Sequence, residues 1–312
     1  VSGSWEQRSR PVLRVLPRRA PPIARRLAQL LTVMVLPLAW LAYARGLRGV
    51  ARKMEGHLGN PTAGLRGFAN VLGRSIAHFW RDRLQLKAAS AVYAHDQACG
   101  VVALLNKWLH GVPYEYDAHE IVPFRARRTG LCRLILEFTL ERIIVRNSAL
   151  CHVVNRPMKR IYARLYGPAP MVIRPNDFFE DRNVVLDSDG PRLMLYIGAT
   201  GPYRRMDDMM SVARANGARV VVFCEDPGQV RRVIGADEVL GLAGYEPALL
   251  ERLAGSAAYL WCFFDASVLS YRYSLPNKFF QALALGVPII AAEGTYLGRL
   301  IARHGFGMIL GS

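Results

Sequence analysis

The spacing of apolar and polar residues divides the chain into two successive runs of alternating strands and helices. In the first run, short apolar segments predict strands at 88–93, 114–116, 150–154 and 171–173. Helical periodicity between them predicts helices at 96–110, 131–146 and 159–166. The second run predicts strands at 193–197, 220–223, 238–240, 259–263 and 287–291, and helices at 206–215, 248–255 and 278–285. This alternation indicates parallel sheets with helical crossovers.

The segment 176–191 separates the two runs. It contains Asn, Asp, Gly and Pro and has no apolar period, so we interpret it as an interdomain linker. We therefore expect one Rossmann-like domain over 1–175 and a second over 192–312. A chain of 312 residues, 52% of them hydrophobic, is long enough to bury two such cores.

The excess of basic residues belongs to the first part of the chain. Residues 1–180 carry 28 Lys and Arg against 11 Asp and Glu, whereas residues 181–312 carry 13 of each. A basic domain usually binds nucleic acid or anionic lipid. No RNA-recognition, zinc-finger or helix-turn-helix pattern accompanies these bases. We therefore expect an anionic membrane surface as a partner and no nucleic acid.

An apolar run at Leu27–Ala44 lies within the basic segment. From Gln7 to Met54 the chain has 11 bases and no acid. An apolar helix with cationic ends is typical of shallow insertion at a membrane surface. A core helix and a transmembrane span are the alternatives, although 18 residues with a central Pro37 are short for a span. A signal peptide is excluded, because the run begins late and no small-residue cleavage site follows.

The five cysteines are scattered along the chain, and no pair has CxxC spacing. Neither a zinc site nor a disulfide framework is therefore indicated. Buried free thiols in a reducing compartment are the expected state. Together with the basic apolar segment, this predicts a cytoplasmic protein that is peripheral at the inner face of the membrane.

The most informative segment is Ser274-Leu-Pro-Asn-Lys278, followed by Gln281-Ala-Leu-Ala-Leu-Gly-Val-Pro-Ile-Ile290. It predicts an amphipathic helix that ends at a Gly-x-Pro turn and leads into a short apolar strand. The N–H groups at a helix start, with a Lys nearby, favour an anionic ligand. In order and spacing, the segment resembles the donor-site signature of family 4 glycosyltransferases of GT-B fold.

A second segment, Tyr116-Asp-Ala-His-Glu120, resembles the Asp-x-His-Glu motif beside the acceptor in the same family. The two segments stand in the right order on the two predicted domains. The resemblance implies an α/β protein of GT-B fold, with two doubly wound Rossmann-like domains that face a cleft. The family's first strand and last elements have no counterpart here, so we expect both domains to be incomplete at the chain ends.

The resemblance also implies which residues hold the donor. GT-B enzymes generally bind the nucleotide diphosphate with cations and helix starts, without a metal. Arg204 and Arg205 follow the Gly198 turn, where the family carries a phosphate-binding Lys. A solvated basic turn is the alternative interpretation of these two arginines. The residues expected at the donor are Arg204, Arg205, Ser274, Lys278 and Gln281, and no metal ligand is expected.

Three positions depart from the family pattern. The Arg that usually precedes the phosphate-binding Lys is Ala199 here, and the two ribose-binding Glu residues are replaced by Tyr273 and Gln281. Gln281 can accept one hydrogen bond and donate another, so it binds ribose less strongly than a carboxylate would. The losses indicate either a divergent branch or a reduced affinity for the donor.

His119 is the candidate catalytic residue. It follows a predicted strand end, where open α/β sheets place their ligands, and the matching His of the family contacts the transferred sugar. Asp117, Glu120 and His95 are expected on the acceptor side. A His that caps the loop, and a purely structural His95-Asp96 pair, are the alternative interpretations.

We therefore expect a glycosyltransferase of hexosyltransferase type, retaining and metal-independent. Its donor would be a UDP- or GDP-linked sugar, and its acceptor a membrane-associated polyprenyl-linked or envelope saccharide. No other cofactor is expected, because Gly198-Ala-Thr-Gly201 lacks the third glycine of a dinucleotide fingerprint. The chain has no GxSxG, HExxH or Walker sequence. A catalytically silent GT-B binding protein and a nucleotide-sugar epimerase are the alternatives.

Overall fold

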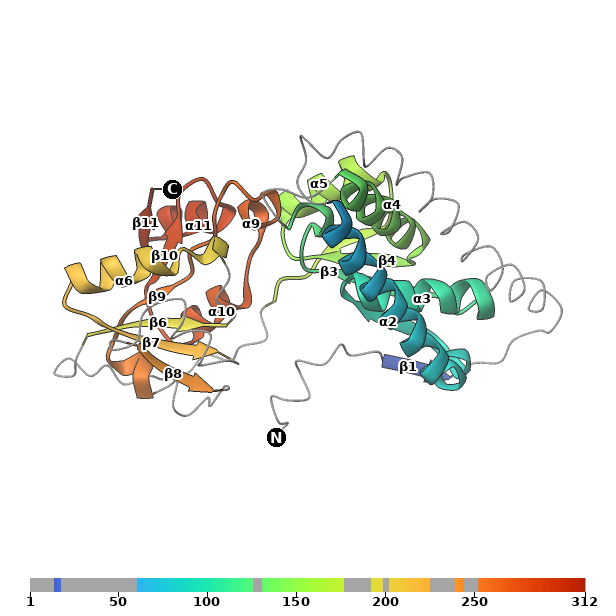
Figure 1. Ribbon diagram of the computed structural model, residues 1–312, viewed down its shortest axis with the longest axis horizontal. Helices are drawn as coiled ribbons and strands as arrows, with labels where there is room; N and C mark the ends of the chain where they lie inside the picture. The colour runs from blue at the N-terminus through green and yellow to red at the C-terminus, as the bar shows by residue number, and fades with distance from the viewer. Residues whose placement is uncertain are drawn as a thin grey trace. The chain divides into compact units, whose positions relative to one another are not determined.

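The computed structural model describes residues 14–17, 61–125, 131–176, 192–198, 202–224, 239–243 and 252–311. The chain divides into two compact units, Val1–Arg174 and Pro175–Ser312, and each unit is built on its own sheet (Figure 1). The apolar run Leu27–Ala44 and residues 177–191 of the expected linker lie outside the described residues. None of the described helices combines the length and the hydropathy that crossing a membrane requires.

The first unit contains a sheet with the strand order β1-β2-β3-β4-β5. Its strands are β1 (Arg14–Pro17), β2 (Ala89–His95), β3 (Tyr114–Ala118), β4 (Leu150–Val153) and β5 (Met171–Ile173). Strands β2 to β5 are parallel, whereas β1 pairs antiparallel with β2. Its helical elements are α2 (Pro61–Ala88), α3 (Asp96–His110), the 3-10 turn η2 (Val122–Phe124), α4 (Leu131–Asn147) and α5 (Arg156–Tyr166).

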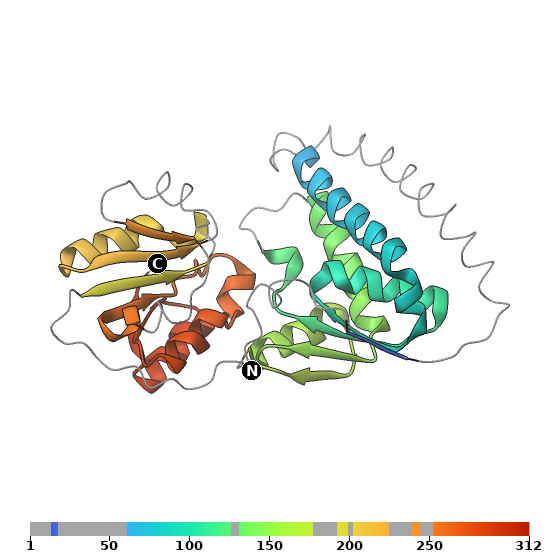
Figure 2. The ribbon, with the colours of Figure 1, turned by 90° about the horizontal axis from the view of Figure 1, so that it is seen from below.

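The two faces of this sheet differ in polarity. Helices α2, α3 and α4 pack together over one face (Figure 2), and the strand residues on that face are apolar or aromatic and buried, among them Val92, Ala94, Tyr114, Tyr116 and Val153. Side chains alternate along a strand, so the intervening residues belong to the other face. The strand register places polar side chains side by side there: Tyr93, His95, Glu115, Asp117 and His152.

The second unit contains a parallel sheet with the order β11-β10-β9-β6-β7-β8. Its strands are β6 (Leu193–Ile197), β7 (Arg219–Cys224), β8 (Val239–Ala243), β9 (Ala257–Trp261), β10 (Ile289–Ala292) and β11 (Gly307–Leu310). Its described helical elements include the 3-10 turn η3 (Pro202–Arg204), α6 (Met206–Ala215), α9 (Leu269–Tyr273), α10 (Asn277–Ala284) and α11 (Tyr296–His304). The parallel pairing expected from the sequence is thus confirmed for β2 to β5 and for the sheet of the second unit, whereas the antiparallel strand β1 was not predicted.

The strand order of the second unit reverses between β6 and β9, which are neighbours in the sheet. In open parallel sheets, ligands bind outside the carboxyl ends of the strands at such a switch point. A core of methionines and aromatics fixes this region, and its largest member, Trp261, is completely buried. The Trp261 indole donates a hydrogen bond to the Arg204 carbonyl over 2.9 Å. The core thereby holds the turn that carries Arg204 beside β9.

Candidate functional site

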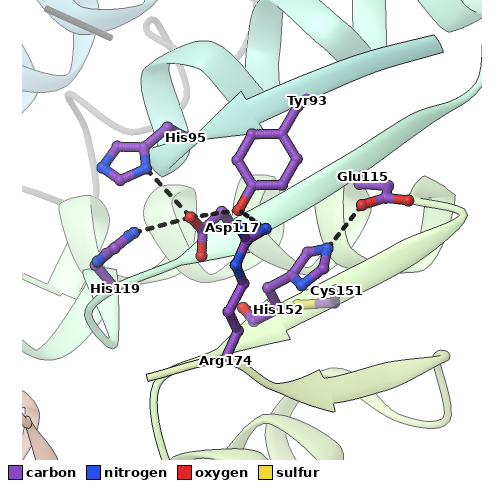
Figure 3. Close-up of polar contacts among 8 residues, drawn as sticks. All are labelled: Tyr93, His95, Glu115, Asp117, His119, Cys151, His152 and Arg174. Atoms are coloured by element: carbon purple, nitrogen blue, oxygen red, sulfur yellow. Dashed lines mark hydrogen bonds and ion pairs between the residues drawn. The ribbon is translucent and has the colours of Figure 1, made fainter. Parts of the chain in front are cut away.

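Three side chains converge on one carboxylate oxygen at the carboxyl ends of β2 and β3 (Figure 3). The Tyr93 hydroxyl donates to Asp117 Oδ2 over 2.7 Å. His95 Nδ1 and His119 Nε2 contact the same oxygen at 3.3 Å and 3.0 Å, and the centroids of the two rings are 4.0 Å apart. Asp117 is only 6% exposed. We call Tyr93, His95, Asp117 and His119 the Asp117 cluster.

The Asp117 cluster is organised around a permanent negative charge. Burial by itself raises the pKa of Asp117, but hydrogen bonds from His119, His95 and Tyr93 outweigh burial and hold that pKa well below its usual range. The same hydrogen bond raises the pKa of His95. An ionised carboxylate can only accept, so both imidazoles turn an N–H toward it. In the neutral form of each ring, the opposite nitrogen is then the one able to accept a hydrogen bond from a ligand hydroxyl.

The polar face of the sheet extends this cluster. Arg174 Nη1 donates to the Tyr93 hydroxyl over 3.3 Å, and its guanidinium lies 5.5 Å from the centroid of the Tyr93 ring. Beside them, His152 Nε2 contacts Glu115 Oε2 at 2.8 Å (Figure 3). No sequence motif identified these residues. The alternation of polar and buried residues along β2 and β3 is the signal that points to them.

Two backbone positions beside predicted site residues are strained. Asp96, directly after His95, has a φ of +61°, and Arg205, directly after Arg204, has a φ of +49°. Among the described residues these are the non-glycine positions with positive φ. Left-handed backbone costs such residues about 1–2 kcal/mol, and strain of this kind is concentrated at functional sites. Asp96 is the first residue of α3, and Arg205 directly precedes α6.

Glu120 belongs to the loop that follows His119 and not to the Asp117 cluster. Its Oε2 pairs with Arg125 Nε at 2.8 Å, and its carbonyl accepts a hydrogen bond from the Tyr162 hydroxyl at 2.8 Å. The structure therefore brings His95, Asp117 and His119 together, whereas their role at a site stays a prediction. Glu120 instead helps to hold the loop in place.

Among the described residues, His95, Asp117 and His119 are also those able to hold a metal ion. One donor atom of each lies within 4.8 Å of the others, and two imidazoles with a carboxylate suit several divalent metals. The same atoms are hydrogen-bonded to one another, which accounts for their convergence without a metal. The metal-independent site expected from the sequence stays a prediction.

The second group of candidate residues lies in the second unit, at the carboxyl ends of β6 and β9. The guanidinium of Arg204 lies 4.0 Å from the centroid of the Phe264 ring and 4.6 Å from that of Tyr271. The amine of Lys278 lies 3.8 Å from the centroid of the Tyr196 ring. We call Tyr196, Arg204, Phe264, Tyr271 and Lys278 the cation cluster. It stands at the switch point of the sheet, where a ligand is expected.

Glycine at position 198 makes room for the lysine of this cluster. A Cβ atom at Gly198 would lie 3.3 Å from Lys278 Cε and 3.6 Å from its Nζ. The φ of Gly198 is +113°, which other residues rarely adopt. The backbone conformation of the turn after β6 therefore favours glycine, and a side chain here would crowd the end of Lys278.

The cation cluster has two positive charges and, among the described residues, no ion pair with a carboxylate. Arg204 Nη1 is buried without a hydrogen-bond partner in the described part of the chain. Burial is the main cause that lowers the pKa of Lys278 to about 7; Cys262 opposes this shift, and Arg204 contributes to it. Cations placed side by side against aromatic faces favour an anion that bridges them. The start of α10, capped by no side chain, adds N–H groups for the same anion.

The other predicted donor residues have different surroundings. Arg205 forms an ion pair with Asp208 of α6, so its charge is neutralised locally. Ser274 ends α9 and donates its hydroxyl to the Tyr271 carbonyl over 3.1 Å. Gln281 is buried on α10, one turn beyond Lys278. Arg204 and Lys278 are therefore the two predicted donor residues that the structure brings together.

Solved structures provide the comparison with known proteins. Sucrose-phosphate synthase from Thermosynechococcus elongatus matches at 16% identity and a TM-score of 0.56, over 72% of this chain and 61% of that one. HepE of Anabaena in complex with UDP-glucose matches at 14% identity and a TM-score of 0.55, over 76% of this chain and 68% of the HepE chain. WaaG, a glycosyltransferase involved in lipopolysaccharide biosynthesis, matches at 13% identity and a TM-score of 0.51, over 64% of this chain and 61% of the WaaG chain.

These similarities establish the architecture. The chain has an α/β fold of the GT-B type. It spans about three fifths of the length of the sucrose-phosphate synthase chain that it matches. No protein-family model matches the sequence, and no curated protein matches it. The predicted fold class is thus confirmed, and the membership in family 4 stays a prediction.

Proposed function

We propose that this protein is a glycosyltransferase that takes a sugar from a nucleotide-sugar donor held by the cation cluster. The observation that carries the proposal is the pair Arg204 and Lys278 at the switch point of the second sheet. The cluster offers two cations, a helix start and aromatic faces, but no carboxylate among the described residues. A nucleoside diphosphate supplies the missing negative charge at two adjacent phosphates.

The same charges favour the departure of the nucleotide. Negative charge develops on the diphosphate as its bond to the sugar breaks, and fixed cations outside bulk water stabilise that charge more than they stabilise the ground state. Arg204 and Lys278 are placed to do this. We therefore assign them both to donor binding and to leaving-group stabilisation. The GT-B glycosyltransferase neighbours, one of them in complex with UDP-glucose, support a donor of this class.

His119 is the proposed contact with the transferred sugar and the acceptor. Asp117 fixes its ring by accepting from one nitrogen, so the other nitrogen is available to a hydroxyl. His95 is held by the same oxygen and offers a second imidazole nearby. Hydrogen-bonding groups around a central carboxylate suit a polyhydroxylated ligand. The resemblance of the Asp117-Ala-His-Glu120 motif supports this role, as well as a retaining, metal-independent transfer.

We further propose an acceptor at an anionic membrane surface, such as a polyprenyl-linked saccharide. The support is the basic charge of residues 1–180 and the apolar run Leu27–Ala44 with its cationic flanks. The protein should then sediment with vesicles that contain anionic lipid and be released by high salt. Equal binding to neutral vesicles would contradict an electrostatic attraction to anionic lipid. If the protein binds neither kind of vesicle, the proposed membrane association is wrong.

A catalytically silent binding protein is the second candidate. The observation in its favour is the loss of the two ribose-binding carboxylates, at Tyr273 and Gln281. Calorimetric titration with UDP, GDP and the matching nucleosides tests both candidates. We expect the diphosphates to bind and the nucleosides to bind far more weakly. Release of nucleoside diphosphate from UDP- and GDP-linked sugars then separates an enzyme from a binder. If neither diphosphate binds, the glycosyltransferase fails, and the chain is instead a silent GT-B protein that binds a partner enzyme or lipid.

A further inference from the structure

A carboxyl group is buried beneath the loop that follows His119. Glu141, on α4, is 0% exposed and touches three different elements of the first unit. The Tyr116 hydroxyl of β3 lies 2.6 Å from its Oε1, and the Tyr162 hydroxyl of α5 lies 3.0 Å from the same oxygen. Gln97 of α3 donates to its Oε2 over 3.0 Å. No step of the proposed reaction uses this carboxyl group.

The hydroxyl of Tyr162 has two acceptors but one proton. It lies 2.8 Å from the Glu120 carbonyl and 3.0 Å from Glu141 Oε1. If Glu141 is ionised, Tyr162 donates to the charged oxygen, and the Glu120 carbonyl loses this hydrogen bond. If Glu141 is protonated, its own O–H can donate to the Tyr162 oxygen. Tyr162 is then able to donate to Glu120, so both contacts are satisfied.

We propose that Glu141 is a positioning residue that carries a proton in the active protein, and that this proton lets Tyr162 anchor the loop beginning at His119. The proposal rests on the proposed function for its effect on transfer, but not for its effect on the loop. Residues 119–125 are then held through the Glu120 carbonyl in the arrangement that places His119 against Asp117. Loss of the proton from Glu141 redirects Tyr162 and loosens the loop.

The surroundings favour the protonated form up to about pH 7. Burial raises the pKa of Glu141 to about 7, although Tyr116, Tyr162, Arg125 and Gln97 all oppose that shift. Burial also raises the pKa values of the tyrosines and the thiol that face it, so these groups stay neutral: Tyr114, Tyr116, Cys151, Tyr162 and Tyr166. Arg125 stays positive, and Asp96, Glu120 and Glu137 are the other charged groups nearby.

Two variants and a matched control test the proposal. Glu141→Gln cannot ionise and keeps a donor toward Tyr162. Tyr162→Phe removes the anchoring hydroxyl. Tyr166→Phe, one turn further along α5, removes a buried hydroxyl that has no hydrogen-bond partner among the described residues, so it controls for the loss of an oxygen from this core.

Amide hydrogen exchange of residues 119–125 measures the anchoring without any need for activity. At about pH 8, above the pKa of Glu141, we expect these amides to exchange about fivefold faster in the wild type than in Glu141→Gln, the change that one lost hydrogen bond produces. At about pH 6 the two should exchange alike. In Tyr162→Phe these amides should exchange fast at both pH values, and in Tyr166→Phe they should exchange as in the wild type. Equal exchange of wild type and Glu141→Gln at both values would overturn the proposal.

The pH profile of kcat supplies the catalytic readout. His95 also titrates, with a pKa raised by Asp117, so the informative quantity is the difference between the wild type and Glu141→Gln. We expect Glu141→Gln to keep more of its kcat above pH 7 than the wild type does, while the affinity for the donor is the same in the two proteins at each pH. Identical profiles would overturn the role in transfer. If the chain transfers no sugar, the proposed function fails, while hydrogen exchange still decides the role of Glu141.

Discussion

Replacing Lys278 by Met tests the donor site most sharply. Methionine has a similar length and stays apolar, so it fits the space between Gly198 and the Tyr196 ring that the lysine stem occupies. The substitution removes one of two cations and leaves Arg204 in place. Arg303→Met, an exposed change on α11 of the same unit, removes the same charge away from the cation cluster and serves as the control.

The size of the effect follows from the contact that is lost. A hydrogen bond to a charged group contributes about 1.5–3 kcal/mol, which corresponds to a loss of about 10- to 150-fold in the affinity for a nucleoside diphosphate. Calorimetric titration of UDP and GDP measures it. The matching nucleosides should be indifferent to the change. If nucleosides and diphosphates weaken equally, Lys278 has a structural role and the proposed donor site is wrong.

The pH dependence of this binding has a definite sign. The pKa of Lys278 is lowered to about 7 by burial, so the unliganded protein holds a neutral amine above that pH. A diphosphate binds the charged amine, and binding above pH 7 must therefore take up a proton. We expect the affinity of the wild type to fall by up to about tenfold for each pH unit above 7. Lys278→Met should show no such slope in this range.

The stability of the variant provides an independent check. The native state disfavours the charged lysine, so this residue lowers stability below pH 7, and the penalty disappears as the pH rises from about 7 towards 10.5. An ammonium that is removed from water without a carboxylate partner disfavours the native state. Denaturant unfolding at about pH 6 should therefore show Lys278→Met to be more stable than the wild type. A less stable variant would contradict the assignment of an uncompensated charge.

Three further predictions concern the Asp117 cluster. His119→Ala should lower the transfer rate far more than the affinity for the donor, with little change in Tm; equal losses in kcat and donor affinity would place His119 elsewhere. Asp117→Asn should return the pKa of His95 towards its ordinary value, as followed by NMR of the imidazole, because the hydrogen bond that His95 donates to the Asp117 carboxylate is the main cause that raises that pKa. Asp117 stabilises the native state above its unfolded pKa and loses this effect on acidification, so the variant should also show a smaller loss of stability towards low pH. Chelation with EDTA should leave transfer unchanged, whereas loss of activity that is restored by a divalent metal would assign the cluster to metal binding instead.

The sequence was sufficient for the alternation of strands and helices and for the positions of the two motifs. Helix α3 and strands β5 and β6 begin and end at the predicted residues. Their boundaries are marked by turn residues or by short, well-separated apolar runs. By contrast, the 28-residue helix α2 was missed. Its sequence contains Gly64, Gly67 and Gly73 and lacks a regular apolar stripe, so packing against α3 and α4 rather than local propensity stabilises it.

The motifs identified Asp117, His119 and Lys278, but not their partners. Tyr93 and Tyr196 reach the two clusters through the register of neighbouring strands, which a single sequence does not specify. Phe264 and Tyr271 lie near Arg204 because β9 is next to β6 in the sheet, a long-range pairing. The sequence did not indicate Glu141 for a different reason. A Glu within an ordinary helical segment is expected to be exposed, and only the tertiary structure shows that it is buried.

Radiolabelled sugar transfer tests the central claim directly. The protein would be incubated with UDP- or GDP-linked sugar and a membrane lipid fraction, and the label would be followed from the nucleotide into the acceptor while release of the nucleoside diphosphate is measured in parallel. We predict that the amount of sugar transferred equals the amount of nucleoside diphosphate released, in the wild type and in Arg303→Met alike. Both amounts should be strongly reduced in Lys278→Met and His119→Ala. Binding of the diphosphate without transfer or release from any donor would contradict the claim that this protein is a glycosyltransferase.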